Sequence, residues 1–196
     1  GGGSDTEKIW ASDLTKFINL IMTYFAFLKG VNVSGHRIIK MTELKAIFED
    51  MDFKNVRTFI QSGNVVFEST LKSASLKKKI EAGFAKALGY SVNVIIRNKD
   101  EMEKIVKEYP FTKIKGHDEC RINVGFLESV PESTLINELE SLSNDDEKFL
   151  VKGNNVYHLS RKNFADSLLG KNIIEKKLKV ICTVRNWNTT NKIQKI

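Results

Sequence analysis

The sequence predicts an α+β protein built from two tandem ferredoxin-like (βαββαβ) subdomains, joined by a short helix and a loop. Short apolar runs and amphipathic stretches follow one another in the order strand, helix, strand, strand, helix, strand. This order occurs twice in the 196 residues. Pro110 and Gly116 punctuate the segment between the two copies. We therefore expect a first subdomain over residues 22–98, a connector over 99–119 and a second subdomain over 120–196.

The first half opens with an unbroken apolar run at 24–28, which is typical of a strand buried on both faces. Thr42 is a suitable N-cap for a helix at 42–51. Ser62-Gly63 provides the tight turn of a hairpin, and Gly89 fits the C-cap of the second helix. The remaining elements are strands at 56–60, 65–67 and 92–96 and a helix at 75–88.

The second half repeats the order of elements without any sequence similarity to the first. Alternating apolar residues at 122–126 predict a half-buried strand, and Pro131 fits the first turn of the next helix. The Lys-Gly-Asn-Asn sequence at 152–155 predicts a hairpin turn. The other elements are helices at 99–109, 169–179 and 187–196 and strands at 148–151, 156–159 and 180–184.

Residues 1–21 are expected to stand apart from the first subdomain. Gly1-Gly2-Gly3-Ser4 has the composition of a linker, and residues 5–21 show the apolar spacing of an amphipathic helix. Met22 directly precedes the first strand and would be a natural start. We expect an extension or added helix at 1–21, with a genuine docking helix as the alternative.

The composition argues against a membrane protein, a secreted protein and a disulfide-rich protein. A hydrophobic content of 41% is enough for a sizeable core. No apolar run approaches the roughly 18 residues of a membrane span, and no signal peptide is visible. Cys120 and Cys182 are too few for a disulfide framework. These features predict a cytoplasmic protein with no membrane partner, and they leave the oligomeric state open.

The net charge of +7 is concentrated near the C-terminus. Residues 161–196 contain Asp166 and Glu175 as their acidic residues and account for the whole excess. One interpretation is a basic face for nucleic acid, and the other is a solvated, lysine-rich helix surface. The basic residues are Arg161, Lys162, Lys171, Lys176, Lys177, Lys179, Arg185, Lys192 and Lys195.

Polar residues gather at one end of the first predicted sheet. In a ferredoxin-like unit, the loop after the first strand, the hairpin and the start of the first helix share this end. Exposed N–H groups at a helix start favour anions, so we expect a phosphorylated or otherwise anionic small ligand there. Alternatively, the glycines only make turns and the amides brace the loop. The candidate ligand-binding residues are Lys29, Asn32, Ser34, His36, Lys40, Gln61, Ser62 and Asn64.

Catalytic groups are scarce. His36, His117 and His158 share no metal-ligand spacing, and neither cysteine belongs to a Cys-x-x-Cys pair. No metal and no cofactor are therefore expected. The leading hypothesis is non-catalytic anion binding, the second is nucleic-acid binding through the basic C-terminal face, and an enzyme with His36 as acid or base ranks third.

Three stretches resemble a known family. Residues 27–35 (Phe-Leu-Lys-Gly-Val-Asn-Val-Ser-Gly) and 56–67 (Val-Arg-Thr-Phe-Ile-Gln-Ser-Gly-Asn-Val-Val-Phe) are similar to the bacterial domain-of-unknown-function family DUF1697, as is Met-Thr-Glu-Leu at 41–44. The resemblance extends from Met22 to about residue 193. It implies an α+β protein with ferredoxin-like parts and no assigned activity. The chain departs from the family pattern at Lys29, Ser34, Leu168 and Val184, where the family usually has Arg, Gly, a basic residue and Thr.

A second family-like signature lies at 174–178 and 183–189. If the two signatures meet in space, Arg185 and Asn186 would complete the anion site. The alternative is that Trp187 anchors the tail in the core and Arg185 caps a helix end.

The cysteines give a geometric prediction. If Cys120 opens one strand and Cys182 lies within its antiparallel neighbour, the two thiols should lie within one or two strand spacings of each other. We expect both to be reduced, buried and slow to react.

Overall fold

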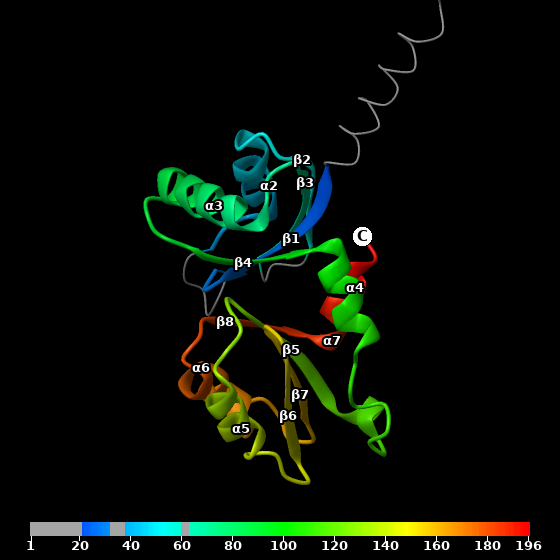
Figure 1. Cartoon of the computed structure of the whole chain (residues 1–196). Helices are drawn as coiled ribbons and strands as arrows, with labels where there is room; N and C mark the ends of the chain where they lie inside the picture. Colours follow the sequence, from blue (N-terminus) through cyan, green and yellow to red (C-terminus); the bar gives the residue numbers. More distant parts are fainter. Residues whose placement is uncertain (1–20, 32–37, 60–62) are drawn as a thin grey trace, which may run out of the picture. The chain divides into compact units, whose positions relative to one another are not determined.

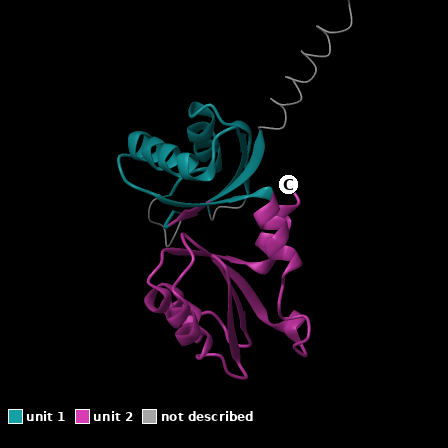
Figure 2. Ribbon diagram, in the orientation of Figure 1, with its two compact units in different colours: residues 1–26, 30–99 teal, residues 27–29, 100–196 magenta. Residues whose placement is uncertain are grey.

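The computed structural model describes residues 21–31, 38–59 and 63–196, and the chain forms two compact units (Figure 2). The first unit comprises residues 1–26 and 30–99, and the second comprises residues 27–29 and 100–196. The helix and loop expected to form a connector therefore belong to the second unit. Both units are α+β, as the sequence predicts. The expected helix at 5–21 falls almost wholly outside the described residues.

The first unit contains a four-stranded antiparallel sheet in the order β2-β3-β1-β4, with α2 and α3 on one face (Figure 1). Phe48 of α2 forms the centre of an aromatic core, with its ring 5.3 Å from that of Phe67 and 5.8 Å from that of Phe84. The elements are β1 (Met22–Lys29), α2 (Met41–Asp50), β2 (Lys54–Phe59), β3 (Asn64–Ser69), α3 (Ser73–Leu88) and β4 (Asn93–Asn98).

The ends of the two helices test the predicted caps. Gly89 is confirmed as the C-cap of α3, with φ at 73°. Thr42 is wrong as the N-cap of α2, because the Lys40 carbonyl already accepts the Leu44 N–H and the helix begins at Met41. The first turn therefore closes before the Thr42 hydroxyl could cap it.

The second unit has a four-stranded antiparallel sheet in the corresponding order, β6-β7-β5-β8 (Figure 1). Its core is mainly aliphatic, with Leu127, Leu139, Ile174 and Leu178 buried between the sheet and α5 and α6. The sheet and its helices are β5 (Arg121–Leu127), α5 (Ser133–Glu140), β6 (Glu147–Lys152), β7 (Asn155–Ser160), α6 (Ile173–Leu178) and β8 (Cys182–Asn186). The further helical segments are α4 (Lys99–Lys107), η1 (His117–Glu119), η2 (Leu168–Lys171) and α7 (Trp187–Gln194).

Two helix predictions in this unit are wrong in detail. Pro131 lies ahead of α5, whose N-cap is Glu132, and does not occupy the first turn. The single helix expected at 169–179 is interrupted at Asn172, which has a left-handed φ of 56° and separates η2 from α6.

The register of β8 overturns the predicted proximity of the thiols. Cys182 pairs with Leu127 at the end of β5, whereas Cys120 precedes the start of β5. Seven residues of strand separate the two levels, on the order of 20 Å at about 3.4 Å per residue. Cys182 is buried but Cys120 is only half-buried, and both are free thiols. The strand order is as expected, and the error lies in where β8 begins.

In the described part of the chain, no helix combines the length and the apolar character that a bilayer crossing requires.

Candidate functional site

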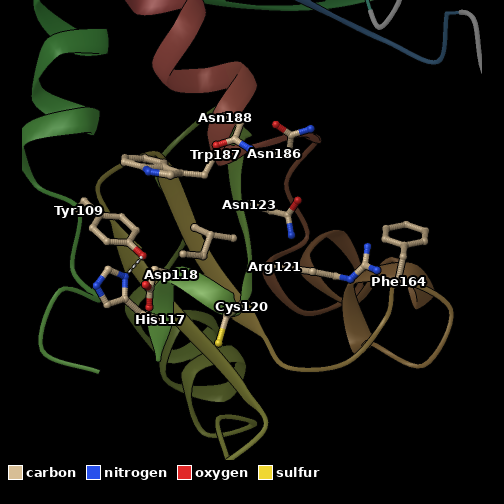
Figure 3. A pocket seen from close by; sticks show the side chains of 11 residues that line it. Tyr109, His117, Asp118, Cys120, Arg121, Asn123, Phe164, Asn186, Trp187 and Asn188 are labelled. Carbon is tan, nitrogen blue, oxygen red and sulfur yellow. Dashed lines mark hydrogen bonds between the residues drawn. The ribbon is translucent and has the colours of Figure 1, made fainter. Parts of the chain in front are cut away.

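A pocket of about 550 Å³ opens in the second unit, where β5 begins and β8 ends (Figure 3). The register explains its position. β7 pairs with β5 as far as Arg121, but β8 pairs with it only as far as Asn123, where the partner is Asn186. The chain then turns into α7. The first two residues of β5 therefore extend past the end of β8 and border the pocket.

Two stacked aromatic rings form one side of the pocket. Tyr109 and Trp187 have centroids 4.6 Å apart and planes inclined by 28°. The Tyr109 hydroxyl lies 3.2 Å from His117 Nδ1. Burial, together with the nearby Cys120 and Asp118, raises the pKa of Tyr109 to about 12. The phenol therefore stays neutral and available as a hydrogen-bond donor at physiological pH.

Arg121 and Phe164 lie on the opposite side (Figure 3). The Phe164 side chain is 61% exposed although it is apolar. The Arg121 side chain is exposed at the start of β5 and has no hydrogen-bond or ion-pair partner among the described residues. The pocket thus holds a cation that no described group of the protein neutralises.

Carboxamides lie between these two sides. Asn186 is the N-cap of α7, and its Oδ1 accepts the Thr189 N–H at 2.7 Å. Asn188 is exposed in the first turn of α7. Asn123 comes from β5 and directs its Nδ2 toward His158 Nδ1 at 3.3 Å. The N-terminus of α7 and the start of β5 together supply the polar lining.

A buried polar network lies behind Asn123. The Glu147 carboxylate is 2.7 Å from His158 Nε2 and accepts hydrogen bonds from Ser167 Oγ at 2.6 Å and from the Leu168 N–H at 3.0 Å. The network fastens the residues just after Phe164 to the sheet. It therefore positions both Asn123 and the segment that carries Phe164.

Burial and hydrogen bonding set the protonation states of this network. Burial raises the pKa of Glu147, but the hydrogen bonds from Ser167, His158 and Leu168 outweigh it, and the pKa is lowered. Burial lowers the pKa of His158 despite the adjacent carboxylate. A neutral His158 that donates from Nε2 to an ionised Glu147 and accepts from Asn123 at Nδ1 satisfies all these contacts.

The sequence-predicted loop site is described only in part. Asn32, Ser34, His36, Gln61 and Ser62 lie outside the described residues, and with His36 the enzymatic hypothesis also lies outside them.

Three further loop candidates are described. Lys29 belongs to the second unit, where it forms an ion pair with Glu175 and donates to the Cys182 carbonyl at 2.9 Å. Asn64 is buried and donates to the Phe59 carbonyl at 2.9 Å, which braces the hairpin. Lys40 is exposed at the start of α2.

Arg185 and Asn186 have different surroundings. The Arg185 guanidinium is buried and donates to Leu28 O at 2.9 Å, Thr183 Oγ1 at 2.8 Å and Val184 O at 2.9 Å. It joins β8 to the end of β1. Asn186 lines the pocket, as does Trp187, which is half-buried. Sequence reasoning singled out this corner but missed Tyr109, Arg121 and Phe164.

Comparisons with known proteins place the chain in a family. The profile of the family described as "Protein of unknown function (DUF1697)" matches residues 21–157, well over half of the chain. The chain belongs to the DUF1697 family. The matched region of this DUF1697 protein ends before the second signature, at 174–189. A search of curated proteins gave no match.

One solved structure supports the fold. The conserved bacterial protein SP0830 from Streptococcus pneumoniae superimposes with a TM-score of 0.72 at 21% identity. The alignment covers 89% of the DUF1697 chain and 98% of the streptococcal one. At this identity the likeness establishes the α+β fold alone.

Proposed function

We propose that this DUF1697 protein binds a small phosphorylated or otherwise anionic ligand without catalysing a reaction, in the pocket where β5 begins and β8 ends. The observation that supports this is Arg121, a guanidinium without a partner among the described residues, at the side of a 550 Å³ pocket. A guanidinium can hold a phosphate through two parallel hydrogen bonds. Asp118 lies beside His117, away from Arg121 (Figure 3), so its negative charge is not directly opposite the proposed phosphate position.

This pocket replaces the loop at residues 30–40 as the preferred anion site. Lys29, the cation nearest that loop's start, is already paired with Glu175. Among the described residues, an anion at the loop would have to compete with this carboxylate or rely on Lys40. The loop stays a second candidate location, and the experiment below separates the two.

Isothermal titration calorimetry with ribose 5-phosphate tests the proposal. We expect saturable binding that weakens about ten-fold in Arg121→Gln, since hydrogen bonds to charged groups contribute about 1.5–3 kcal/mol. Arg57→Gln makes the same charge change in the first unit and should leave the affinity unchanged. If Lys40→Gln loses binding and Arg121→Gln keeps it, the anion site is at the loop. Equal affinities in all variants would refute both locations.

Nucleic-acid binding through the basic C-terminal face is the second candidate function. Arg185 is buried. Lys162 Nζ lies 3.6 Å from Asp146 Oδ2, and Lys177 Nζ lies 3.6 Å from Glu138 Oε2. These three side chains therefore contribute less to a free positive surface. Five exposed lysines remain without an ion-pair partner among the described residues: Lys171, Lys176, Lys179, Lys192 and Lys195.

The salt dependence of RNA binding tests this second candidate. Each phosphate contact adds nearly one unit to the slope of log K against log salt concentration. The double change Lys192→Gln and Lys195→Gln should lower that slope by up to about two units. A slope near zero in the unmodified protein would exclude the basic face as a nucleic-acid surface.

We also propose that each unit is a ferredoxin-like fold and that the protein is cytoplasmic. The strand orders β2-β3-β1-β4 and β6-β7-β5-β8 support the first point, because they place the first strand of each unit between its third and fourth. Two free cysteines support the second. Cross-strand NOEs between β1 and β4 and cell fractionation are the respective tests.

A further inference from the structure

Two aromatic surfaces face the pocket from opposite sides. Trp187 has one face covered by Tyr109, so the pair forms a stacked aromatic platform at the side of the cavity. Across the pocket, Phe164 keeps 61% of its surface in solvent (Figure 3). Binding of a flat apolar group over an exposed phenylalanine is favourable, because it removes apolar surface from water.

The carboxamides between these surfaces have complementary polarity. Asn123 uses its Nδ2 on His158, which leaves Oδ1 as an acceptor at the pocket. Asn186 uses its Oδ1 on the Thr189 N–H, which leaves Nδ2 as a donor. Neither remaining atom has another partner among the described residues. A donor and an acceptor fixed in this way match the edge of a heterocycle that carries both, as nucleobases do.

We infer that the ligand of this pocket is a nucleoside phosphate, whose base lies against Trp187 and Phe164 and whose phosphate binds Arg121. The inference rests on the proposed function and adds the chemical class of the ligand. Aromatic side chains bind bases of any sequence because every base has a π face, and the carboxamides then select among base edges. The same chemistry is found in a free mononucleotide and in a single-stranded nucleic acid.

Adenosine 5′-monophosphate and ribose 5-phosphate form a matched pair of probes, since they differ by the base alone. In calorimetry we expect the nucleotide to bind the full chain at least about ten-fold more tightly, the effect of one base–aromatic stack. Trp187→Leu should remove this advantage while the affinity for ribose 5-phosphate stays unchanged. Equal affinities of the unmodified protein for both probes would overturn the inference and leave anion binding intact. Failure of both probes to bind would remove the proposed function itself.

Phe164→Ala covers the case in which Trp187→Leu does not fold. Phe164 is exposed, so its loss should cost little stability, yet it should weaken the nucleotide several-fold and ribose 5-phosphate not at all. Val130→Ala, another exposed apolar residue of the second unit, is the matched control and should affect neither probe. A Phe164→Ala variant that keeps the full base advantage, together with unchanged binding by Trp187→Leu, contradicts the stacking arrangement.

Fluorescence provides an independent readout. The chain has two tryptophans, Trp10 and Trp187, so Trp10→Phe leaves Trp187 as the reporter. Its emission should be quenched by the nucleotide and unaffected by ribose 5-phosphate, and the absence of quenching at saturation would contradict stacking. A uridine pentanucleotide that quenches at lower concentration than uridine 5′-monophosphate would identify single-stranded RNA as the source. Quenching by both at the same concentration would identify a free nucleotide as the ligand.

Discussion

The two units have the same strand order but different interiors. The first fills the space between sheet and helices with aromatic rings, among them Phe48, Phe53 and Phe67, and the buried polar side chains in its described residues are Asn64 and Arg97. The second has a mainly aliphatic core and adds the buried Glu147–His158 pair. The described part of the first unit has the same strand order without a buried carboxylate–histidine pair.

The position of the polar network shows what it does. Glu147 holds Ser167 and Leu168, which follow Phe164 in the chain, and His158 holds Asn123. One end of the network therefore reaches Asn123 at the pocket, and the other holds residues three and four positions after Phe164, which also lines it. In the described residues, packed aromatic rings fill the first unit, whereas the buried polar network of the second lies behind the pocket where we propose a ligand site. The predictions below test this contrast.

Phe48→Ala should produce the largest effect. Phe48 is fully buried and packs against three other rings, so its truncation should lower the free energy of unfolding by about 3–5 kcal/mol. Ribose 5-phosphate binding should persist under conditions where the protein stays folded. Urea denaturation measures the loss, and a change below about 1 kcal/mol would mean that the aromatic cluster is not the structural centre of the first unit.

Glu147→Gln should produce a smaller loss of stability with a functional consequence. The amide cannot accept from Ser167, His158 and Leu168 as the carboxylate does, so the expected cost is about 1–3 kcal/mol. Amide hydrogen exchange should increase at residues 163–169, and ribose 5-phosphate binding should weaken. The exposed Glu138→Gln is the control, with an expected change within about 0.5 kcal/mol. Faster exchange spread evenly over the whole second unit would contradict a local positioning role.

The second unit should lose stability in acid before the first. The pKa of His158 is lowered from 6.5, so the unfolded chain takes up a proton there before the folded one does, and stability falls as the pH drops below about 6.5. The lowered pKa of Glu147 adds a second loss below 4.5. Each unit of pKa difference contributes about 1.4 kcal/mol. Hydrogen exchange at pH 7.5, 5.5 and 4.5 follows each unit separately, and His158→Gln should flatten the change above pH 5.5. A steeper loss of protection in the first unit would contradict the prediction that the second unit is the more acid-sensitive.

The cysteines give the smallest effect, a difference in the rate of thiol labelling with no change in stability. Cys120 is half-buried and lines the pocket, while Cys182 is buried in the core. A maleimide should label Cys120 in the native protein and Cys182 only after denaturation. Mass spectrometry of the two labelled peptides measures this order, and simultaneous labelling would contradict the burial of Cys182 in the core.

Local sequence signals predicted most of the fold. Gly89 and the hairpin turn at residues 152–155 act through their own backbone, so their effects are readable from sequence. The sequence predicts the start of β8 two residues too early, because Val180 and Ile181 are apolar. In the structure Lys179 leaves α6 in a left-handed conformation, and the Cys182 N–H bonds Glu175 Oε1 at 2.7 Å. That contact between separate elements fixes the strand start.

The pocket could not be predicted in the same way. Arg121, Phe164 and Trp187 are far apart in sequence and come together through the pairing of β5 with β7 and β8. Lys29 was a natural candidate for anion binding because it is basic and precedes a glycine. Its pairing with Glu175 depends on a residue 146 positions away, for which the sequence contains no local signal.

The site assignment is tested most directly by an NMR titration of the ¹⁵N-labelled full chain with adenosine 5′-monophosphate. We predict that the large chemical-shift changes will be confined to Tyr109, residues 117–123, Phe164 and residues 186–188, with the Trp187 indole N–H among them. The aromatic core of the first unit should be unaffected. Changes centred on Lys40 and the residues around it, with none at Arg121 or Trp187, would contradict the account.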